Sequence, residues 1–263
     1  MDLQLNDKRA FVSGSTQGIG YAVAARLAEE GAAVVLNGRS EDRVQASVRR
    51  LREEVPGAAV AGLAADFGDA ASVGRLLDAL EDVDVLVNNV GLFGLTDFRD
   101  VADDEWQHYL DINLMSGVRL SRRLLDPMLA RGWGRIVFIA SESGVNVPAD
   151  MVPYGVTKAA VVALGNGLAK LTRGTGVTVN TILGGPTYSD GVAATVRQIA
   201  ASQGMAEGDL KAAIIGDNAT TLLQRFIEPD EIASLVAYVA SPLASATNGA
   251  ALRADGGVLT TLL

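Results

Sequence analysis

Short apolar runs alternate with longer helical patterns along this chain of 263 residues. The apolar runs are continuous, which is typical of strands that are buried on both faces of a parallel sheet. A helix that joins two such strands makes a right-handed crossover. The pattern therefore predicts an α/β fold, with a doubly wound parallel sheet of about seven strands and helices on both faces. The expected strands are residues 10–12, 33–37, 58–65, 83–88, 135–140, 177–182 and 250–253.

The chain is expected to form one domain over residues 1–263, because no linker and no shift in composition divides it. One segment departs from the alternation. Residues from about 187 to 226 show helical patterns broken by glycines, with no strand. A long excursion between strands of a compact domain usually serves function, so this segment is expected to be a helical lid over a substrate site. An ordinary pair of surface helices is the alternative.

Composition narrows the classes of partner. The net charge is −9, whereas surfaces that bind phosphate backbones or anionic membranes are basic, so neither nucleic acid nor membrane is an expected partner. The chain has no cysteine, and its one histidine, His108, cannot form a metal site alone, so no metal is expected. We find no apolar leader and no long apolar run, which favours a cytoplasmic protein.

A glycine-rich turn follows the first expected strand and opens a helix. Glycine at these positions lets the backbone approach a pyrophosphate, whose charge meets the free amides at the start of the helix. A tight strand-to-helix turn without a ligand is the alternative. The residues expected to cradle the cofactor are Gly14, Ser15, Thr16, Gln17, Gly18, Ile19 and Gly20.

The end of the second strand bears on the choice of cofactor. An acid there would accept from an adenosine 2′-hydroxyl, whereas Arg39 suits a 2′-phosphate. NADP(H) is therefore expected in preference to NAD(H), which stays possible; a solvated charge leading the helix is the alternative role for Arg39. Further cofactor contacts are expected at the carboxyl ends of the next two strands, where ligands bind in open parallel sheets. These are Asp66, Phe67, Asn89 and Gly91.

Tyr154 and Lys158 are four residues apart and share one face of a predicted helix. An ammonium close to the phenol favours phenolate, so we expect the pKa of Tyr154 to be lowered from about 10. Such a tyrosine can give a proton to a carbonyl oxygen near neutral pH. Ser141 lies thirteen residues upstream, and Ser143 is the alternative serine. The alternative for the Tyr154–Lys158 pair is a surface pair without chemistry.

Together these motifs, with Asn113, resemble the classical short-chain dehydrogenase/reductase family over nearly the whole chain. The resemblance implies a Rossmann-type fold in which Tyr154 is the general acid/base and Ser141 steadies the reacting oxygen. Lys158 would hold the nicotinamide ribose, and Asn113 would hold a water that relays protons to it. Thr187, after the sixth strand, is expected to contact the nicotinamide.

The resemblance implies an NADP(H)-dependent oxidoreductase that interconverts a ketone and a secondary alcohol. The side chains expected to line its small-molecule pocket are Phe93, Val147, Met151 and Tyr188. Within the family the chain looks most like β-ketoacyl-acyl-carrier-protein reductases, which makes a β-ketoacyl-thioester reductase one alternative. A catalytically silent NADP(H)-binding regulator is an alternative of another class. A homo-oligomer, tetramer or dimer, is expected because the helix around residues 159–164 is apolar over a wide surface.

Overall fold

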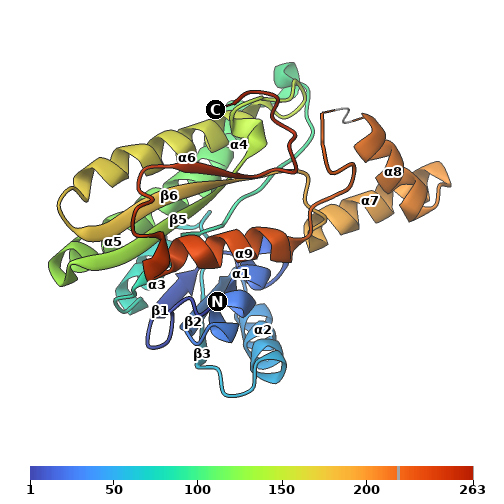
Figure 1. Ribbon diagram of the computed structural model, residues 1–263. Helices are drawn as coiled ribbons and strands as arrows, with labels where there is room; N and C mark the ends of the chain where they lie inside the picture. Colours follow the sequence, from blue (N-terminus) through green and yellow to red (C-terminus); the bar gives the residue numbers. More distant parts are fainter. Residues whose placement is uncertain (218–219, 263) are drawn as a thin grey trace.

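The computed structural model describes residues 1–217 and 220–262, whose strands form one seven-stranded parallel sheet in the order β3-β2-β1-β4-β5-β6-β7 (Figure 1). The predicted α/β fold with a doubly wound parallel sheet is confirmed. The strands are β1 (Arg9–Val12), β2 (Ala33–Gly38), β3 (Val60–Ala64), β4 (Val85–Asn88), β5 (Trp133–Ser141), β6 (Gly176–Gly184) and β7 (Ala251–Ala254).

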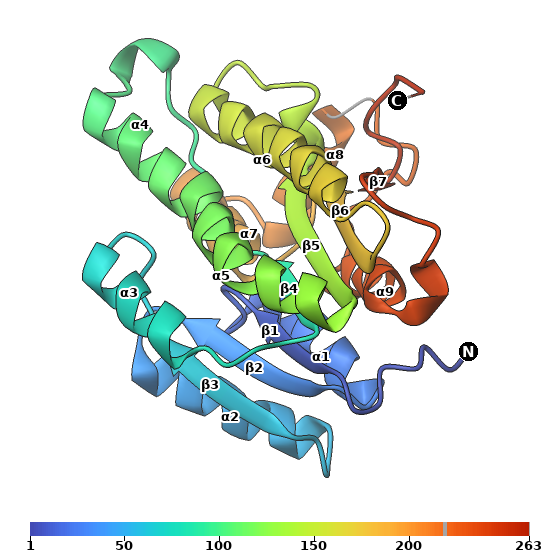
Figure 2. The same ribbon diagram turned by 90° about the vertical axis from the view of Figure 1, so that its left-hand side faces the viewer.

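Helices cover both faces of the sheet (Figures 1 and 2). One apolar core lies under α1 (Gly18–Glu29), α2 (Glu41–Glu54) and α9 (Pro229–Ala240). A second core lies under α3 (Ala70–Ala79), α5 (Ser116–Arg131) and α6 (Val152–Leu171). Continuous apolar strands supply side chains to both cores, as expected for a sheet buried on both faces.

The segment between β4 and α5 carries a short helix, α4 (Asp103–Tyr109), that continues into a π-helical stretch, Leu110–Met115. A π-type turn widens the helix and is frequent at functional sites. The remaining short elements are 3-10 turns at Phe98–Asp100, Glu142–Gly144 and Pro242–Ala244.

The order of the strands reverses between β1 and β4, which are hydrogen-bonded neighbours in the sheet. The chain leaves β1 toward β2 on one side and leaves β4 toward β5 on the other. A crevice opens outside the carboxyl ends at such a switch point, and ligands of doubly wound folds bind there. The glycine-rich turn after β1 and the Asn88–Gly91 turn after β4 both lie at this edge.

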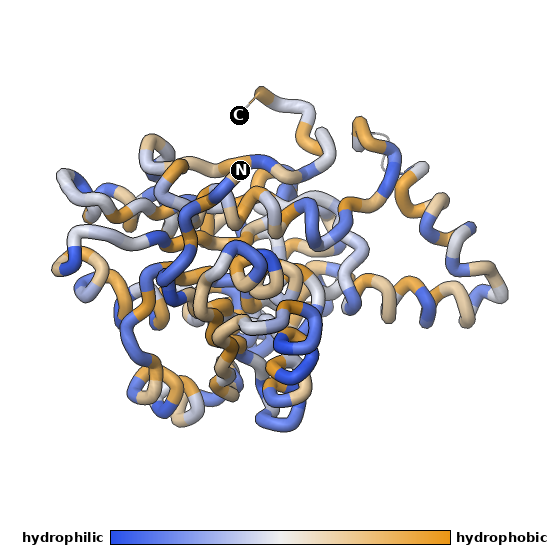
Figure 3. Tube along the Cα trace, turned by 60° about the horizontal axis from the view of Figure 1, so that its bottom comes forward, coloured by the Kyte–Doolittle hydropathy of each residue, from blue (hydrophilic) through white to orange (hydrophobic). Residues whose placement is uncertain are grey.

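The segment expected to be a lid contains α7 (Asp190–Gln203) and α8 (Glu207–Asp217), which project from the body of the molecule (Figure 1). Figure 3 shows apolar and polar residues mixed along this arm. Its base is closed by a parallel bridge between Thr187 and Ile227, with Tyr188 N donating to Ile227 O at 2.8 Å. Both helices fall within residues 187–226, the segment expected to be a lid, of which residues 218–219 lie outside the described residues.

The wide apolar helix expected at residues 159–164 is part of α6, whose Val161 packs into the second core. Other apolar side chains of α6 face outward: Val156 is 43% exposed and Leu171 61%. Across residues 1–217 and 220–262, we find no helix with the length and apolar character needed to cross a lipid bilayer.

Candidate active site

The glycine-rich turn after β1 contains two glycines in the left-handed backbone conformation. Gly14 has a φ of 61° and Gly18 a φ of 59°, which side chains with a Cβ rarely adopt. Gly20 is needed for a different reason, because a Cβ there would overlap Gly14 O and Asn89 Nδ2. The turn therefore requires glycine at all three positions of the predicted motif.

Polar side chains hold this turn against the neighbouring strands. Asn89 Nδ2 donates to Ser13 O at 3.0 Å and to Gly14 O at 2.9 Å. Ser15 is fully buried, with its hydroxyl donating to Val12 O and accepting from Asn37 N. Asn89 and Ser15 thus fix the backbone of the turn through hydrogen bonds. The side chain of Gln17, in contrast, is exposed to solvent.

A carboxylate from a distant segment reaches the turn. Gly18 N donates to Asp190 Oδ2 at 2.7 Å, although 172 residues separate the two. Asp190 is the first residue of α7, and Ser189 caps that helix by accepting from Val192 N. The helix that begins the expected lid therefore starts at the glycine-rich turn, and one amide of this turn donates to a carboxylate.

The end of β2 packs closely against the glycine-rich turn. A Cβ on Gly38 would overlap Thr16 Cγ2, so the missing side chain lets Thr16 lie against this strand. Arg39 is exposed, and no hydrogen bond or ion pair joins its guanidinium to a described residue. At the next strand, Asp66 Oδ1 accepts from Gly68 N at 2.9 Å, while the Phe67 side chain is buried in the core. Contact between residue 67 and a cofactor would therefore come from its backbone.

The expected catalytic serine and tyrosine come from two elements in close backbone contact. Ser141 ends β5, the 3-10 turn Glu142–Gly144 follows, and this turn packs on α6, which carries Tyr154 and Lys158. A Cβ on Gly144 would lie 2.8 Å from both Ala159 N and the Lys158 carbonyl carbon. This approach requires glycine and brings the strand end against the tyrosine helix.

Lys158 and Asn113 are drawn together beside Gly91. Lys158 is 4% exposed, and its Nζ donates to Ile139 O at 2.9 Å. Asn113, in the π-helical stretch, donates from Nδ2 to Leu92 O and to Thr157 Oγ1, each at 3.0 Å. A Cβ on Gly91 would be 3.3 Å from Lys158 Nζ and 3.5 Å from Asn113 Oδ1. The alternative of an exposed Tyr154–Lys158 pair is therefore excluded for the lysine.

A family model described as short chain dehydrogenase matches residues 8–200. The chain is 41% identical over 263 residues to the uncharacterized oxidoreductase YvaG of Bacillus subtilis, with both chains fully covered. It is 32% identical to the 3-oxoacyl-acyl-carrier-protein reductase FabG of Vibrio cholerae, over 97% of this chain and 99% of the relative. L-sorbose reductase of Gluconobacter frateurii, solved with NADPH and L-sorbose, superposes with a TM-score of 0.94 at 31% identity and full coverage of both chains.

The chain belongs to the short-chain dehydrogenase family. It is therefore an oxidoreductase that acts on CH–OH or ketone groups. This confirms the family and the enzyme class expected from the sequence, and it sets aside the catalytically silent regulator.

The expected lowering of the Tyr154 pKa is wrong for the protein without cofactor. Burial raises the pKa of Tyr154 to about 12, against an opposing effect of the hydrogen bond with Ser141. Burial also lowers the pKa of Lys158 to about 8, partly opposed by the carboxylate of Glu142. For Tyr154 the charges of Glu142 and Tyr109 act in the same direction as burial, whereas for Lys158 burial outweighs the stabilising carboxylate of Glu142. The spacing in the sequence predicts that Tyr154 and Lys158 are close together, but it does not show how far they are removed from water. It therefore could not predict the direction of the pKa shift of Tyr154.

The residues expected to contact substrate divide into two groups. The ring of Phe93 lies 6.3 Å from that of Tyr154 in an edge contact, and Phe93 is 47% exposed. Val147 packs where Gly155 lacks a side chain, and Met151 is half-buried at the start of α6. These three lie beside the tyrosine helix.

Tyr188 belongs instead to the arm formed by α7 and α8. Its hydroxyl donates to Glu207, its ring lies 5.3 Å from that of Phe226, and Lys211 Nζ lies 3.5 Å from the ring centre. These contacts place Tyr188 in the internal packing of the arm. The apolar character of Tyr188 in the sequence did not distinguish that role from substrate contact.

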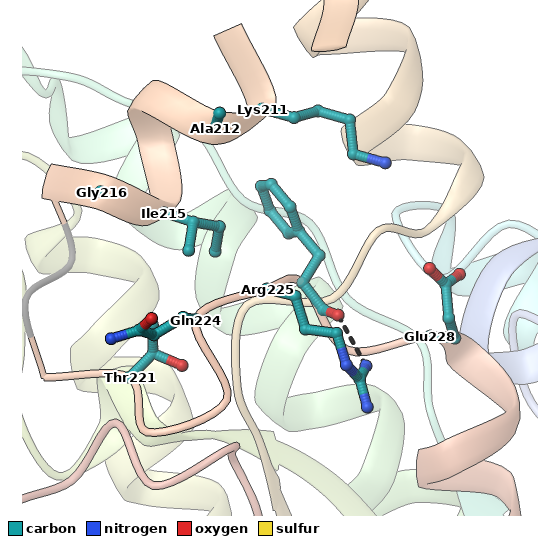
Figure 4. Close-up of a pocket in the computed structure, with 9 residues that line it drawn as sticks. Lys211, Ala212, Ile215, Gly216, Thr221, Gln224, Arg225 and Glu228 are labelled. Carbon is teal, nitrogen blue, oxygen red and sulfur yellow. Dashed lines mark hydrogen bonds between the residues drawn. The ribbon is translucent and has the colours of Figure 1, made fainter. Parts of the chain in front are cut away.

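A hollow of about 540 Å³ lies within this arm, between α8 and residues 221–228 (Figure 4). Its lining includes Lys211 and Arg225, and Arg225 forms an ion pair with Glu231 at 2.7 Å. None of the expected catalytic residues lines this hollow. Thr187, whose hydroxyl donates to Gly185 O at 2.8 Å, lies at the base of the arm rather than in the hollow.

Two residues near the site were not singled out from the sequence. Asp190 reaches Gly18, and its only local signal is its place in the first turn of a capped helix. Glu142 accepts a hydrogen bond from Ser141 and follows it directly in the chain. The sequence analysis considered only the serines on either side of Glu142, so it gave Glu142 no role.

We predict that Gly144→Ala separates the serine from the tyrosine helix. The added methyl group would overlap backbone atoms that cannot rotate away, and overpacking of this kind costs about 1–3 kcal/mol. Turnover should fall at least tenfold because a shift of about 1 Å disrupts catalytic alignment. Steady-state kinetics and urea unfolding check this result. Gly167→Ala on α6, where a Cβ meets nothing within 4 Å, is the matched control; wild-type turnover in Gly144→Ala would contradict the prediction.

We also predict that Lys158→Met inactivates the enzyme without destabilising it. The pKa of Lys158 falls on folding, so its protonated form opposes folding below about pH 8, and this cost is relieved as pH rises toward 10.5. Replacing it should raise the free energy of unfolding at pH 7 by up to about 3 kcal/mol, with a smaller gain at pH 9.5. Denaturant unfolding at both pH values measures this, with exposed Lys170→Met as control. An equal loss of stability at both pH values would refute it.

Proposed function

We propose that this chain is an NADP(H)-dependent oxidoreductase that interconverts a ketone and a secondary alcohol, with Tyr154 as the general acid/base. The proposal depends on one observation: the β5 end that carries Ser141 packs through Gly144 on the helix that carries Tyr154 and Lys158. This group lies at the carboxyl edge of the sheet, where the glycine-rich turn also lies. A proton donor next to a nucleotide cradle is the arrangement that carbonyl reduction needs.

The roles of the side chains follow from their hydrogen-bonding capacity. A raised pKa keeps Tyr154 protonated at neutral pH, so it can give its proton to a carbonyl oxygen. The Ser141 hydroxyl would donate to the same oxygen and stabilise the negative charge that develops there. Lys158, with Asn113 beside it, would hold cofactor hydroxyls and supply the positive charge that stabilises a tyrosinate.

The residues of the cradle fit a dinucleotide. Gly14 and Gly18 have positive φ values, and the Gly18 amide donates to the Asp190 carboxylate, which is how the start of a helix binds an anion. The exposed guanidinium of Arg39 suits a 2′-phosphate, and the related L-sorbose reductase was solved with NADPH. When bound, the nicotinamide supplies or accepts the hydride. We therefore propose NADP(H) as the preferred cofactor.

Tyr154→Phe tests the proposed function. Removing the phenol proton should lower turnover by about 10²–10⁴-fold, because no other group replaces the general acid. NADPH binding, followed by its fluorescence, should change little. Tyr238→Phe, on exposed Tyr238 of α9, is the matched control. Full activity of Tyr154→Phe on any ketone or alcohol substrate would reject the proposed role.

Arg39→Ala tests the cofactor. Loss of a charge-assisted hydrogen bond to the 2′-phosphate should raise the KM for NADPH by about 10–100-fold. The KM for NADH should stay within about twofold, since NADH lacks that phosphate. Arg49→Ala, at an exposed position of α2, controls for the general loss of positive charge. An equal effect on both cofactors, or a wild-type preference for NADH, would contradict the proposal.

The relatives include a 3-oxoacyl-acyl-carrier-protein reductase, which keeps a β-ketoacyl thioester as the second candidate substrate. The net charge of −9 does not favour this substrate, because an acidic carrier protein needs a basic docking surface.

We also propose that the enzyme is cytoplasmic. It forms a homo-oligomer through the outward apolar side chains of α6. The chain is a single domain in which the α7–α8 arm acts as a lid.

A further inference from the structure

Asp190 is a carboxylate that the fold carries from the start of the α7–α8 arm to the start of α1. Its Oδ2 accepts from Gly18 N at 2.7 Å, across 172 residues of sequence. The side chain is exposed, and within residues 1–217 and 220–262 it forms no ion pair. The hydrogen bond with Glu54 raises the pKa of Arg50, and the charge of Asp190 adds to this rise, so the carboxylate also lies near α2. Asp190 is therefore a charge of the arm that is held at the glycine-rich turn.

The helix that Asp190 contacts has no cap of its own. The first amides of an α-helix have no partner within the helix, so they need an acceptor from elsewhere. Gln17 stands at the N-cap of α1 without a side-chain hydrogen bond, and the first turn of α1 has no acidic residue. By contrast, Ser40 caps α2 and Asp69 caps α3. The start of α1 is thus left open by its own sequence, and Asp190 supplies an acceptor from a distant segment.

The same helix start is where the pyrophosphate of a dinucleotide would bind. Free amides and the positive end of the helix dipole hold phosphate at such a position. A phosphate that approached the Gly18 amide would meet the negative charge of Asp190, and like charges a few ångströms apart repel each other. The carboxylate and the phosphate therefore compete for the same end of α1.

We propose that Asp190 occupies a phosphate position of the cofactor site in the free protein, and that this autoinhibitory contact weakens the binding of any cofactor that contains a pyrophosphate. The cofactor has to displace Asp190 from Gly18, which separates the start of α7 from the glycine-rich turn. The apparent affinity then falls in proportion to the fraction of molecules in which the contact is open. This inference rests on the proposed function, since it needs the cofactor phosphates at this turn, and it goes further by assigning an internal competitor.

Asp190→Ala tests the proposal through three ligands. The dissociation constant of NADPH, measured by its fluorescence, should fall about tenfold, the lower end of the range for a hydrogen bond to a charged group. That of NADH should fall by the same factor, because both cofactors contain the pyrophosphate. Adenosine 2′-monophosphate contains no pyrophosphate, so its inhibition constant against NADPH should not change. Asp190→Asn, which keeps an acceptor oxygen without the charge, should give a smaller gain for both cofactors.

Asp209→Ala is the matched control within the arm. Asp209 is an exposed acidic residue in the first turn of α8, so its removal changes the net charge and the helix start in the same way. No hydrogen bond joins its side chain to the glycine-rich turn. The constants of all three ligands should stay within about twofold of the wild type, because salt screens an exposed charge that does not contact the site.

Stopped-flow binding of NADPH shows in which state Asp190 acts. Because the contact belongs to the free protein, Asp190→Ala should raise the association rate constant and leave the dissociation rate constant nearly unchanged. A gain confined to dissociation, an unchanged or lower affinity, or an equal gain in Asp209→Ala would overturn the inference. Near-UV circular dichroism checks that each variant is folded, and Asp190→Asn supplies the comparison if Asp190→Ala is not.

The proposed function fails in a different way. If Asp190→Ala binds NADPH more tightly while the wild type reduces no ketone and oxidises no alcohol, the proposed function is overturned and the competition by Asp190 is upheld. If the wild type binds neither NADPH nor NADH, both are overturned.

Discussion

The site depends on one close backbone contact, between the turn after β5 and the helix α6. Gly144 allows it, because a Cβ there would collide with backbone atoms of α6. Gly155 allows it from the other side, since a Cβ on that residue would lie 2.8 Å from Ser143 O. Two elements that are separate in sequence are thereby fixed together, and Ser141 comes to lie with Tyr154 and Lys158.

The same contact removes these side chains from water, and that controls their chemistry. Without cofactor, Tyr154 is held neutral and Lys158 loses its proton more easily than an exposed lysine would. Folding therefore carries a cost for the Lys158 ammonium, whose proposed role is to hold the cofactor, as is frequent where activity and stability compete. The phenol is suited to give a proton in this state. A bound cofactor with a positive ring would favour the tyrosinate and so permit the reverse reaction.

The sequence predicted the fold well because each strand is apolar throughout and is bounded by helical patterns. It placed the second strand at residues 33–37, close to the observed Ala33–Gly38, and it placed the start of the excursion at about residue 187, where Thr187 forms its bridge with Ile227. The glycine-rich turn between the first strand and the following helix could also be predicted, and Gly14 and Gly18 within it have positive φ. These features are local, and local chemistry determines them.

Features that depend on distant contacts or on solvation could not be predicted in the same way. The approach of Asp190 to Gly18 joins residues 172 positions apart. Tyr188 packs within the arm because Glu207, Lys211 and Phe226 surround it, which no spacing rule reveals. The pKa of Tyr154 shifts in the direction opposite to the prediction because burial outweighs the hydrogen bond with Ser141.

The central claim is that a buried, neutral Tyr154 becomes acidic only when a positive cofactor ring lies beside it. The most direct test is a tyrosinate absorbance titration, taken as the difference between wild type and Tyr154→Phe, with and without NADP⁺. The account predicts that Tyr154 ionises with a pKa of about 12 in the free protein and at a clearly lower pH with NADP⁺ bound. Ionisation of Tyr154 below its ordinary value of about 10 in the free protein would contradict it.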